Sequence, residues 1–241
     1  MARVKEHYDQ VLSEVYVWML GGFDSGLENN TAFFAKHNIK PAHSGLAVDL
    51  GAGCGFQSIP LARAGFSVLA MDLDAKLLKE LSVHSGDLAV KIVQDDLIDF
   101  DKYLKDSAEL VVCMTDTLLH LESKDRVVGL FHKVFSALEN AGKFIITFRD
   151  LTLELADLDR FIPVKSDENI IFTCFLEYEP ETVKVHDLIY KRADEKWRLN
   201  KSFYRKLRLS KEWVEERLSS AGFSRIQASL DSGLVTIIAA K

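Results

Sequence analysis

The spacing of hydrophobic positions changes twice along the chain, and each change predicts a different kind of structure. Residues 5–20 repeat apolar side chains at the spacing of one helical face, which predicts an amphipathic helix, and a second helix is expected over 27–36. From residue 46 to residue 148, short and nearly continuous apolar runs alternate with helical patterns. Such runs are typical of parallel strands covered by helices on both faces. Beyond residue 150 the runs become longer and alternate between polar and apolar positions, which predicts antiparallel strands.

The elements of the middle segment follow a regular order of strand and helix. Its expected strands cover residues 46–50, 67–71, 90–93, 110–114 and 143–148. Before the last of them, Ser123 is a suitable N-cap for a helix whose apolar stripe includes Val127 and Leu130. Three antiparallel strands are expected in the insert that follows, over residues 170–178, 182–191 and 196–209. A helix over 211–221 and strands over 225–230 and 234–240 are expected to close the chain.

Composition restricts the class of protein without identifying its chemistry. The 241 residues are 48% hydrophobic and 27% charged, which is ordinary for a globular protein. A net charge of −6 disfavours nucleic acid and anionic membranes as partners, because both require a basic surface. Cys54, Cys113 and Cys174 are far apart, so we expect reduced thiols in a cytoplasmic protein. No signal peptide, membrane span or metal-ligand spacing is recognisable in the sequence.

The most informative motif is an acid followed by three glycines at alternate positions. Asp49 lies near the end of the first expected strand, and Gly51, Gly53 and Gly55 follow it. A strand that leads into a glycine-rich turn and a helix is suited to a nucleotide-like ligand, because the ligand must approach the main chain closely. Proteins that bind nicotinamide dinucleotides have the third glycine one residue later, where this chain has Phe56. An NAD(P)-dependent oxidoreductase is therefore the least favoured alternative.

Acidic residues also follow the second and third expected strands. Asp72 comes 21 residues after Gly51, the spacing at which a carboxylate can accept hydrogen bonds from both ribose hydroxyls. The alternative for Asp72 is a helix N-cap or a turn. Asp95 and Asp96 follow the third strand, where a ligand contact and a capping role both suit the residue type.

With these acids, the Gly51–Gly53–Gly55 spacing resembles motif I of the class I S-adenosylmethionine-dependent methyltransferases. The resemblance implies an α/β fold with a doubly wound, seven-stranded Rossmann-like sheet whose last strand is antiparallel, and S-adenosylmethionine as cofactor. It assigns one acid after the third strand to the adenine amino group, with Asp96 preferred and Asp95 as its competitor. The cofactor-binding residues that the resemblance implies are Asp49, Gly51, Ala52, Gly53, Gly55, Asp72, Leu73, Asp95, Asp96, Leu97 and Met114.

The segments outside this core resemble the lid and the cap of enzymes similar to glycine N-methyltransferase. In such enzymes, aromatics at the positions of Tyr8, Tyr16 and Trp18 close the pocket. The expected organisation is an N-terminal helical lid over 1–44, a cofactor-binding core over 45–150, an antiparallel insert that caps the substrate over 151–209, and a last helix with two strands over 210–241.

Candidates for catalysis and acceptor binding come from the fourth and fifth strand ends and from the added segments. His120 is suited to general-base catalysis near neutral pH, and equally to a structural role at a helix start. Asp116 and Arg149 are further catalytic candidates, and Arg149 is suited either to a substrate carboxylate or to a surface ion pair. The acceptor-binding candidates are Tyr8, Trp18, Arg149, Phe172 and Arg205.

The sequence thus predicts an enzyme that transfers a methyl group from S-adenosylmethionine to a nitrogen or oxygen atom of a small-molecule acceptor. The expected state is a monomer or a homodimer, without a membrane or nucleic-acid partner. An RNA methyltransferase and a non-catalytic S-adenosylmethionine-binding module are the alternatives. The basic and aromatic run over 196–211 would suit single-stranded RNA, but its alternation also fits a strand with one solvated face.

Overall fold

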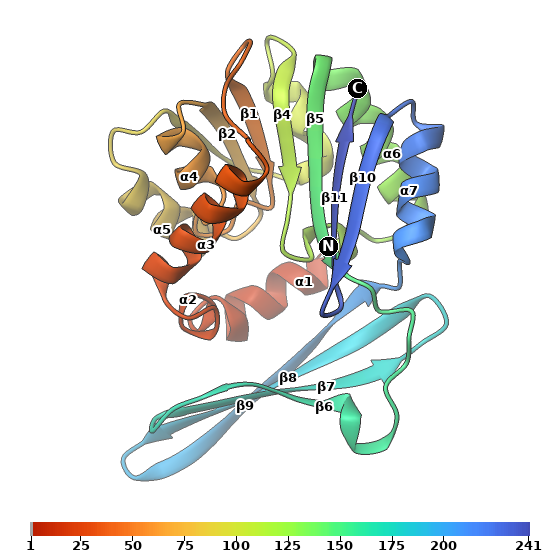
Figure 1. Ribbon diagram of the computed structural model, residues 1–241. Coiled ribbons are helices and arrows are strands. Elements are labelled where there is room, and N and C mark those ends of the chain that lie inside the picture. The colour runs from red at the N-terminus through yellow and green to blue at the C-terminus, as the bar shows by residue number, and fades with distance from the viewer. Residues whose placement is uncertain (1) are drawn as a thin grey trace.

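Two β-sheets of different kinds form the structure, which is a computed structural model (Figure 1). It describes the backbone of residues 2–241 and the side chains of residue 4 and of residues 6–241. The larger sheet has seven strands in the order β10-β11-β5-β4-β1-β2-β3. Its strands are β1 (Leu46–Leu50), β2 (Ser67–Asp72), β3 (Val90–Gln94), β4 (Ala108–Cys113), β5 (Leu138–Arg149), β10 (Ser224–Asp231) and β11 (Leu234–Ala240).

The larger sheet confirms the expected doubly wound α/β fold. Strands β1 to β5 run parallel, and β11 lies antiparallel between β5 and β10. Ala47 and Val48 are neighbours in β1, point to opposite faces of the sheet, and are both fully buried. Burial on both faces explains why the strands of this sheet read as continuous apolar runs rather than as alternating ones.

Helices cover both faces of the larger sheet. One face packs against α6 (Lys124–Ala137), α7 (Lys211–Ser220) and the 3₁₀ helix η2 (Leu97–Tyr103). The other face packs against α3 (Phe23–Lys36), α4 (Ser58–Arg63) and α5 (Ala75–Ser85). The predicted apolar stripe of α6 is fully buried at Val127 and Leu130, and the Ser123 hydroxyl accepts a hydrogen bond from the Arg126 amide as the N-cap. Two short 3₁₀ helices are η3 (Thr117–His120) and η4 (Asp157–Arg160).

The insert is a separate antiparallel sheet with four strands, one more than the sequence predicts. Its order is β6-β7-β8-β9, and the strands are β6 (Phe161–Ser166), β7 (Ile170–Tyr178), β8 (Thr182–Ala193) and β9 (Lys196–Leu207). The additional strand, β6, contains Pro163, which cannot donate a backbone hydrogen bond and normally argues against a strand. It is tolerated because β6 is an edge strand, and the register with β7 shifts between Pro163 and Lys165.

The N-terminal segment is broken where the sequence predicts one continuous helix. It comprises α1 (Ala2–His7), the π-helix η1 (Tyr8–Leu12) and α2 (Tyr16–Met19). The Ser13 hydroxyl donates to the Tyr8 carbonyl and to the Asp74 carboxylate, and the backbone turns there. Val11, Leu12 and Val15 are buried against the insert, so the predicted apolar stripe contacts the smaller sheet.

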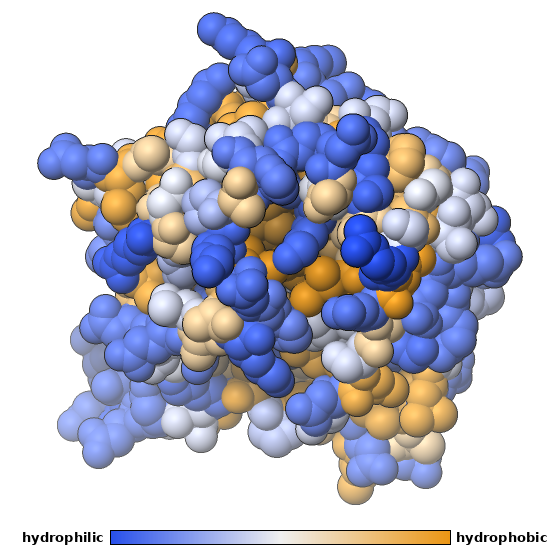
Figure 2. Space-filling model, turned by 45° about the horizontal axis from the view of Figure 1, so that its top comes forward, coloured by the Kyte–Doolittle hydropathy of each residue, from blue (hydrophilic) through white to orange (hydrophobic). Residues whose placement is uncertain are grey.

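The two ends of the larger sheet differ in what covers them. In Figure 1, α1 and the insert lie at the lower end, where the parallel strands finish. Figure 2 views the molecule from the upper front, where hydrophilic residues cover most of the surface and hydrophobic residues show in a central hollow. None of the helices in the described chain has the length and apolar character needed to cross a membrane.

Candidate functional site

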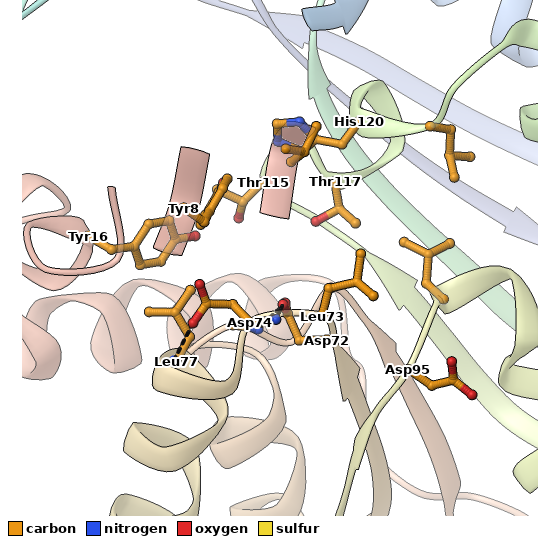
Figure 3. Close-up of a pocket in the computed structure, with 15 residues that line it drawn as sticks. Tyr8, Tyr16, Asp72, Leu73, Asp74, Leu77, Asp95, Thr115, Thr117 and His120 are labelled. Atoms are coloured by element: carbon orange, nitrogen blue, oxygen red, sulfur yellow. Dashed lines mark hydrogen bonds between the residues drawn. The ribbon is translucent and has the colours of Figure 1, made fainter. Parts of the chain in front are cut away.

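A cleft lies where the carboxyl ends of β1 to β4 meet the N-terminal helices (Figure 3). In open α/β sheets, ligands bind at this edge of the sheet. The space between its atoms, including the open mouth, is about 700 Å³, which lies within the usual size of a ligand pocket. The cleft is lined by Gly51, Gly53, Asp72, Leu73, Asp74, Leu77, Asp95, Leu97, Thr115, Thr117, His120 and Leu121 of the core, and by Val4, Tyr8 and Tyr16 of the N-terminal helices.

The three glycines of the motif serve two different purposes. All have positive φ angles, which side chains rarely adopt. A Cβ at Gly51 would overlap the Thr117 side chain, and one at Gly55 would overlap Leu81, so these two glycines permit close packing. A Cβ at Gly53 would have its nearest neighbours, Leu77 and Tyr16, 3.9 Å away. Gly53 therefore borders open space, and a ligand can approach its main chain.

Asp72 connects the glycine turn to the start of α5. Its carboxylate accepts hydrogen bonds from the amides of Gly53 and Asp74, both at 2.8 Å. Burial raises the pKa of Asp72, and the two amides act against that rise. In Figure 3 this carboxylate lies on the floor of the cleft, across from Tyr8 and Thr115. Oxygen lone pairs remain for a ligand, and the ribose role of Asp72 stays a prediction.

Of the two adjacent acids after β3, Asp95 is better placed than Asp96 to contact a ligand in the cleft. Asp95 lines the cleft, where its carboxylate accepts from the Tyr103 hydroxyl at 2.6 Å and from the Asp96 amide at 2.8 Å. Asp96 does not line it, because its carboxylate caps η2 through the Ile98 amide at 3.0 Å. The adenine contact stays a prediction, and the geometry supports Asp95 for it better than the preferred Asp96.

Asp116 joins the end of β4 to β5 and to the insert. Its carboxylate accepts from the backbone amide of Arg149 at 2.7 Å, from the Arg149 guanidinium at 2.5 Å and from Lys206 Nζ at 2.7 Å. Burial acts to raise the pKa of Asp116, but Lys206 and Arg149 hold it well below its usual range. A carboxylate engaged in this way is a poor proton acceptor. Asp116 thus fastens the insert to the core through Lys206, Arg149 is held by Asp116, and the structure does not support either residue as catalytic.

His120 forms the wall between the cleft and a second cavity. Both cavities include His120 and Leu121 in their linings, and the second reaches Tyr204 and Leu207 of β9. Its Nδ1 atom is buried and has no hydrogen-bond partner in the described part of the chain. Burial, reinforced by Lys206, lowers the pKa of His120 to about 3. The imidazole is therefore neutral, and the residue lines both cavities while its Nδ1 stays buried without a partner in the described chain.

The arrangement is shared with a known family. Residues 47–142 match the family described as methyltransferase domain. A structure described as an S-adenosylmethionine-dependent methyltransferase from Clostridium acetobutylicum aligns with a TM-score of 0.74 over 99% of this chain and 98% of that one, at 15% identity. Residues 47–142 are thus a methyltransferase domain, and the matches support a class I S-adenosylmethionine-dependent methyltransferase.

Two further proteins are similar to this methyltransferase. The glycine/sarcosine N-methyltransferase of Aphanothece halophytica is 25% identical over 158 residues, which cover 64% of this chain and 59% of that protein's length. The S-adenosylmethionine-bound structure of CalS10, an amino pentose methyltransferase from Micromonospora echinaspora, aligns with a TM-score of 0.70 at 13% identity, over 94% of this chain and 95% of that chain.

The cleft of the methyltransferase fits its cofactor, S-adenosylmethionine, on physical grounds. The open space beside Gly53 admits a ligand to the main chain, and Asp72 and Asp95 offer carboxylates at separate points of the cleft. S-adenosylmethionine carries a sulfonium and an ammonium group, and acidic surroundings stabilise such charges. Leu73 and Leu97, both predicted cofactor contacts, also line the cleft.

Three other predicted cofactor contacts have side chains outside the cleft. Asp49 is buried beneath the glycine turn, where its carboxylate accepts from the Ser58 hydroxyl at 2.6 Å. Ala52 and Met114 pack in the hydrophobic core with exposures of 2% and 7%. The sequence pattern placed them near the turn correctly, but their side chains point into the protein.

The predicted acceptor-binding residues are not gathered in one place. Tyr8 lines the cofactor cleft rather than the second cavity, and its contact with the acceptor stays a prediction. Trp18 donates to Asp167 at 2.6 Å, and Phe172 packs beside the N-terminal helices, so both join the lid to the insert outside the cleft. Arg205 lines the second cavity, but its guanidinium is paired with Glu179 at 2.7 Å.

Several residues of the methyltransferase cleft were missed at the sequence level. Asp74, Leu77, Thr115, Thr117 and Leu121 all line it. Position alone could have indicated Thr115 and Thr117, since both follow the end of β4 directly. Asp74 caps α5 through two backbone amides and also accepts from the Ser13 hydroxyl, a contact that no local pattern predicts.

Proposed function

We propose that this methyltransferase transfers the methyl group of S-adenosylmethionine to the nitrogen of a small amine. The observation that carries the proposal is the unpartnered, buried Nδ1 of His120 between the cofactor cleft and the second cavity. An amine acceptor in the second cavity would lie beside the His120 ring, and Nδ1 would accept its hydrogen bond when the ring turns toward that cavity. The amine acceptors of similar proteins, glycine or sarcosine and an amino pentose, support the same class.

The environment of His120 favours nitrogen over oxygen as the acceptor atom. A hydroxyl must lose its proton to become a good nucleophile, and a histidine with a pKa of about 3 is a weak base for that task. An amine needs only its neutral form, and burial in the second cavity lowers the pKa of a bound amine. The neutral imidazole can then accept a hydrogen bond from the amine N–H and orient the nitrogen lone pair.

Methyl transfer itself requires positioning and the exclusion of water. When bound, S-adenosylmethionine supplies an electrophilic methyl group on a sulfonium. An acceptor nitrogen would bond to that methyl carbon as the carbon–sulfur bond breaks, with the bonding electron pair left on sulfur. The methylated ammonium then loses its proton to water at the mouth of the second cavity. Holding two reactants in line accounts for most of the acceleration in such a step.

Tyr8 and Tyr16 are suited to cover the sulfonium. Burial raises the pKa of both phenols, so they are neutral. Their rings come from the N-terminal helices and face the Asp72 side of the cleft in Figure 3. The faces of aromatic rings attract cations, and neutral phenols add little competing negative charge.

The test of this proposal is the activity of His120 variants on a panel of small amines and matched alcohols. We expect His120→Ala to lower kcat on amines by roughly 10- to 100-fold, since a positioned hydrogen-bond acceptor is lost. S-adenosylhomocysteine affinity should change little, and His120→Asn should recover part of kcat because its side-chain oxygen can accept the same hydrogen bond. Methylation of alcohols but not amines, or an unchanged kcat in His120→Ala, would contradict the proposal.

A further inference from the structure

The turn that follows β4 has a backbone conformation that its residues rarely adopt. Thr115 and Asp116 have φ angles of 57° and 67°, which lie in the left-handed region. A β-branched residue such as threonine is disfavoured there, and residues other than glycine normally enter the region singly. A strained turn of this kind persists only where its surroundings hold it, and such turns gather at functional sites. The contacts of Thr115 and Asp116 therefore decide how firmly the turn is held.

Contacts from β5 and from the insert hold this turn in place. The Thr147 hydroxyl of β5 accepts from the Thr115 amide at 2.8 Å, and the Thr147 carbonyl accepts from the Asp116 amide at 3.1 Å. The Asp116 carboxylate accepts from the amide and the guanidinium of Arg149 in β5, and from Lys206 Nζ at 2.7 Å. The side chains of Lys206 and Asp116 are 11% and 4% exposed, so little water is available to replace their contact. Lys206 belongs to β9, and the insert thus supplies one support of the turn.

The same turn forms part of the wall of the cofactor cleft. Thr115 and Thr117 both line the cleft (Figure 3). Thr117 packs so closely on Gly51 that a Cβ at Gly51 would lie 2.4 Å from the Thr117 methyl carbon. The Thr115 hydroxyl accepts from Gln57 Nε2 at 3.3 Å, and Gln57 directly precedes α4. A displacement of the turn would therefore disturb both the glycine turn and the cleft wall beside it.

Lys206 itself is outside both ligand spaces. It lines neither the cleft nor the second cavity, whereas its β9 neighbours Arg205 and Leu207 line the second cavity. Direct electrostatics and support of the turn predict opposite effects for its ammonium group. As a cation it would repel the sulfonium of S-adenosylmethionine, so its removal would tighten the binding of that cofactor. As a support of the turn it would strengthen cofactor binding, and its removal would weaken it.

We propose that Lys206 is a positioning residue for the cofactor cleft, which it supports through Asp116 and the strained turn after β4. The insert then has a part in cofactor binding, although none of the described cleft residues belongs to it. Since β9 also forms a wall of the second cavity, one strand supports both ligand spaces. The inference concerns the binding of the cofactor and does not depend on which acceptor is methylated.

Calorimetric titration of Lys206→Met with S-adenosylhomocysteine and with S-adenosylmethionine tests the proposal. We expect the affinity for both to fall roughly 10-fold, because Asp116 loses a buried cationic partner and the turn loses a support. Lys206→Arg keeps the cation and should retain most of the affinity. Lys206→Gln keeps a hydrogen-bond donor for Asp116, so this milder second variant should show a smaller loss. Circular dichroism verifies that each variant is folded.

Two further variants separate support of the turn from general stabilisation. Lys124→Met is the matched control, since it removes another ion pair between core and insert, the more exposed contact of Lys124 with Glu181 at 2.7 Å. It should leave the affinity unchanged. Thr115→Gly relieves the strain, because glycine adopts positive φ angles readily, so Lys206→Met should cost less affinity in that background. An unchanged affinity for S-adenosylhomocysteine in both Lys206→Met and Lys206→Gln, tighter binding of S-adenosylmethionine, or an equal loss with and without Thr115→Gly would overturn the proposal.

Discussion

At the scale of single residues, Asp49 and Asp116 lie at similar places at the ends of strands but differ in pKa. Asp49 is buried with one hydroxyl partner, and its pKa is raised to about 7 by burial, with a smaller contribution from Asp72. Asp116 is equally buried, but two cations keep its pKa low. The sequence places both acids beside the ligand-binding edge of the sheet. Their surroundings, which come from distant segments, decide which one carries a charge.

The raised pKa of Asp49 predicts a pH-dependent stability. An unfolded aspartate ionises near pH 4, so the folded state disfavours ionisation, and stability from this group falls as pH rises through about 7. The full effect is on the order of 4 kcal/mol, since one pKa unit corresponds to about 1.4 kcal/mol. Asp49→Asn keeps an oxygen for Ser58 without the charge. Its unfolding free energy relative to wild type should rise between about pH 4 and pH 7 in urea titrations and level off above that range. A difference that is independent of pH would show that Asp49 ionises normally.

Residue types at strand ends predicted much of the cleft, but not every assignment. Asp72, Leu73, Gly51 and Gly53 line the cleft, as the sequence pattern predicted. The choice between Asp95 and Asp96 depended on which carboxylate caps η2, a local geometry that two adjacent aspartates do not reveal. Phe172 was a reasonable aromatic candidate, but the face on which a strand residue lies relative to a distant cleft is a tertiary property.

At the scale of elements, the N-terminal segment connects both sheets through buried polar contacts. His7 of α1 bonds Asp187 of β8 at 2.8 Å, and both side chains are almost fully buried. Ser13 donates to Asp74 at 2.6 Å beside the cleft. The same segment supplies Tyr8 and Tyr16, so its contacts hold two walls of the cleft in place.

We therefore predict that a chain without residues 1–20 folds but does not transfer methyl groups. The segment contributes only partly buried side chains at the border of one core layer, so the sheet should still fold, whereas the cleft loses its aromatic cover and admits water. Circular dichroism and an S-adenosylhomocysteine release assay give the two readouts. The substitution Ser13→Ala perturbs the same segment less than the truncation does. It should weaken S-adenosylmethionine binding by a few fold, because the hydrogen bond from Ser13 to Asp74 is lost. Full activity of the truncated chain would show that the segment is not the lid.

The pattern of hydrophobic positions predicted the large sheet well, because its central strands β1, β2 and β4 are short, apolar and followed by a helix or turn. Strand β1 was predicted with its observed bounds, Leu46–Leu50. The pattern missed β6, where Pro163 lowers the strand propensity and the edge position removes the penalty. It also predicted one helix over residues 5–20, although the Ser13 hydroxyl competes for the backbone there and the chain turns.

At the scale of the whole molecule, two rigid parts meet around one small reaction space. Asp116 of the core and Lys206 of the insert form the buried ion pair that joins them beside His120. The second cavity opens between these parts, and its space of about 580 Å³, mouth included, suits a small acceptor better than a folded RNA. The net charge of −6 argues in the same direction.

Calorimetric titration of the wild type and of Asp72→Ala with S-adenosylhomocysteine and NADH tests the central claim most directly. The cleft should bind S-adenosylhomocysteine and give no binding heat with NADH. Asp72→Ala should lose on the order of 2–4 kcal/mol of S-adenosylhomocysteine affinity, because two charge-assisted hydrogen bonds to the ribose are removed. Tighter binding of NADH than of S-adenosylhomocysteine, or an unchanged affinity in Asp72→Ala, would contradict the account.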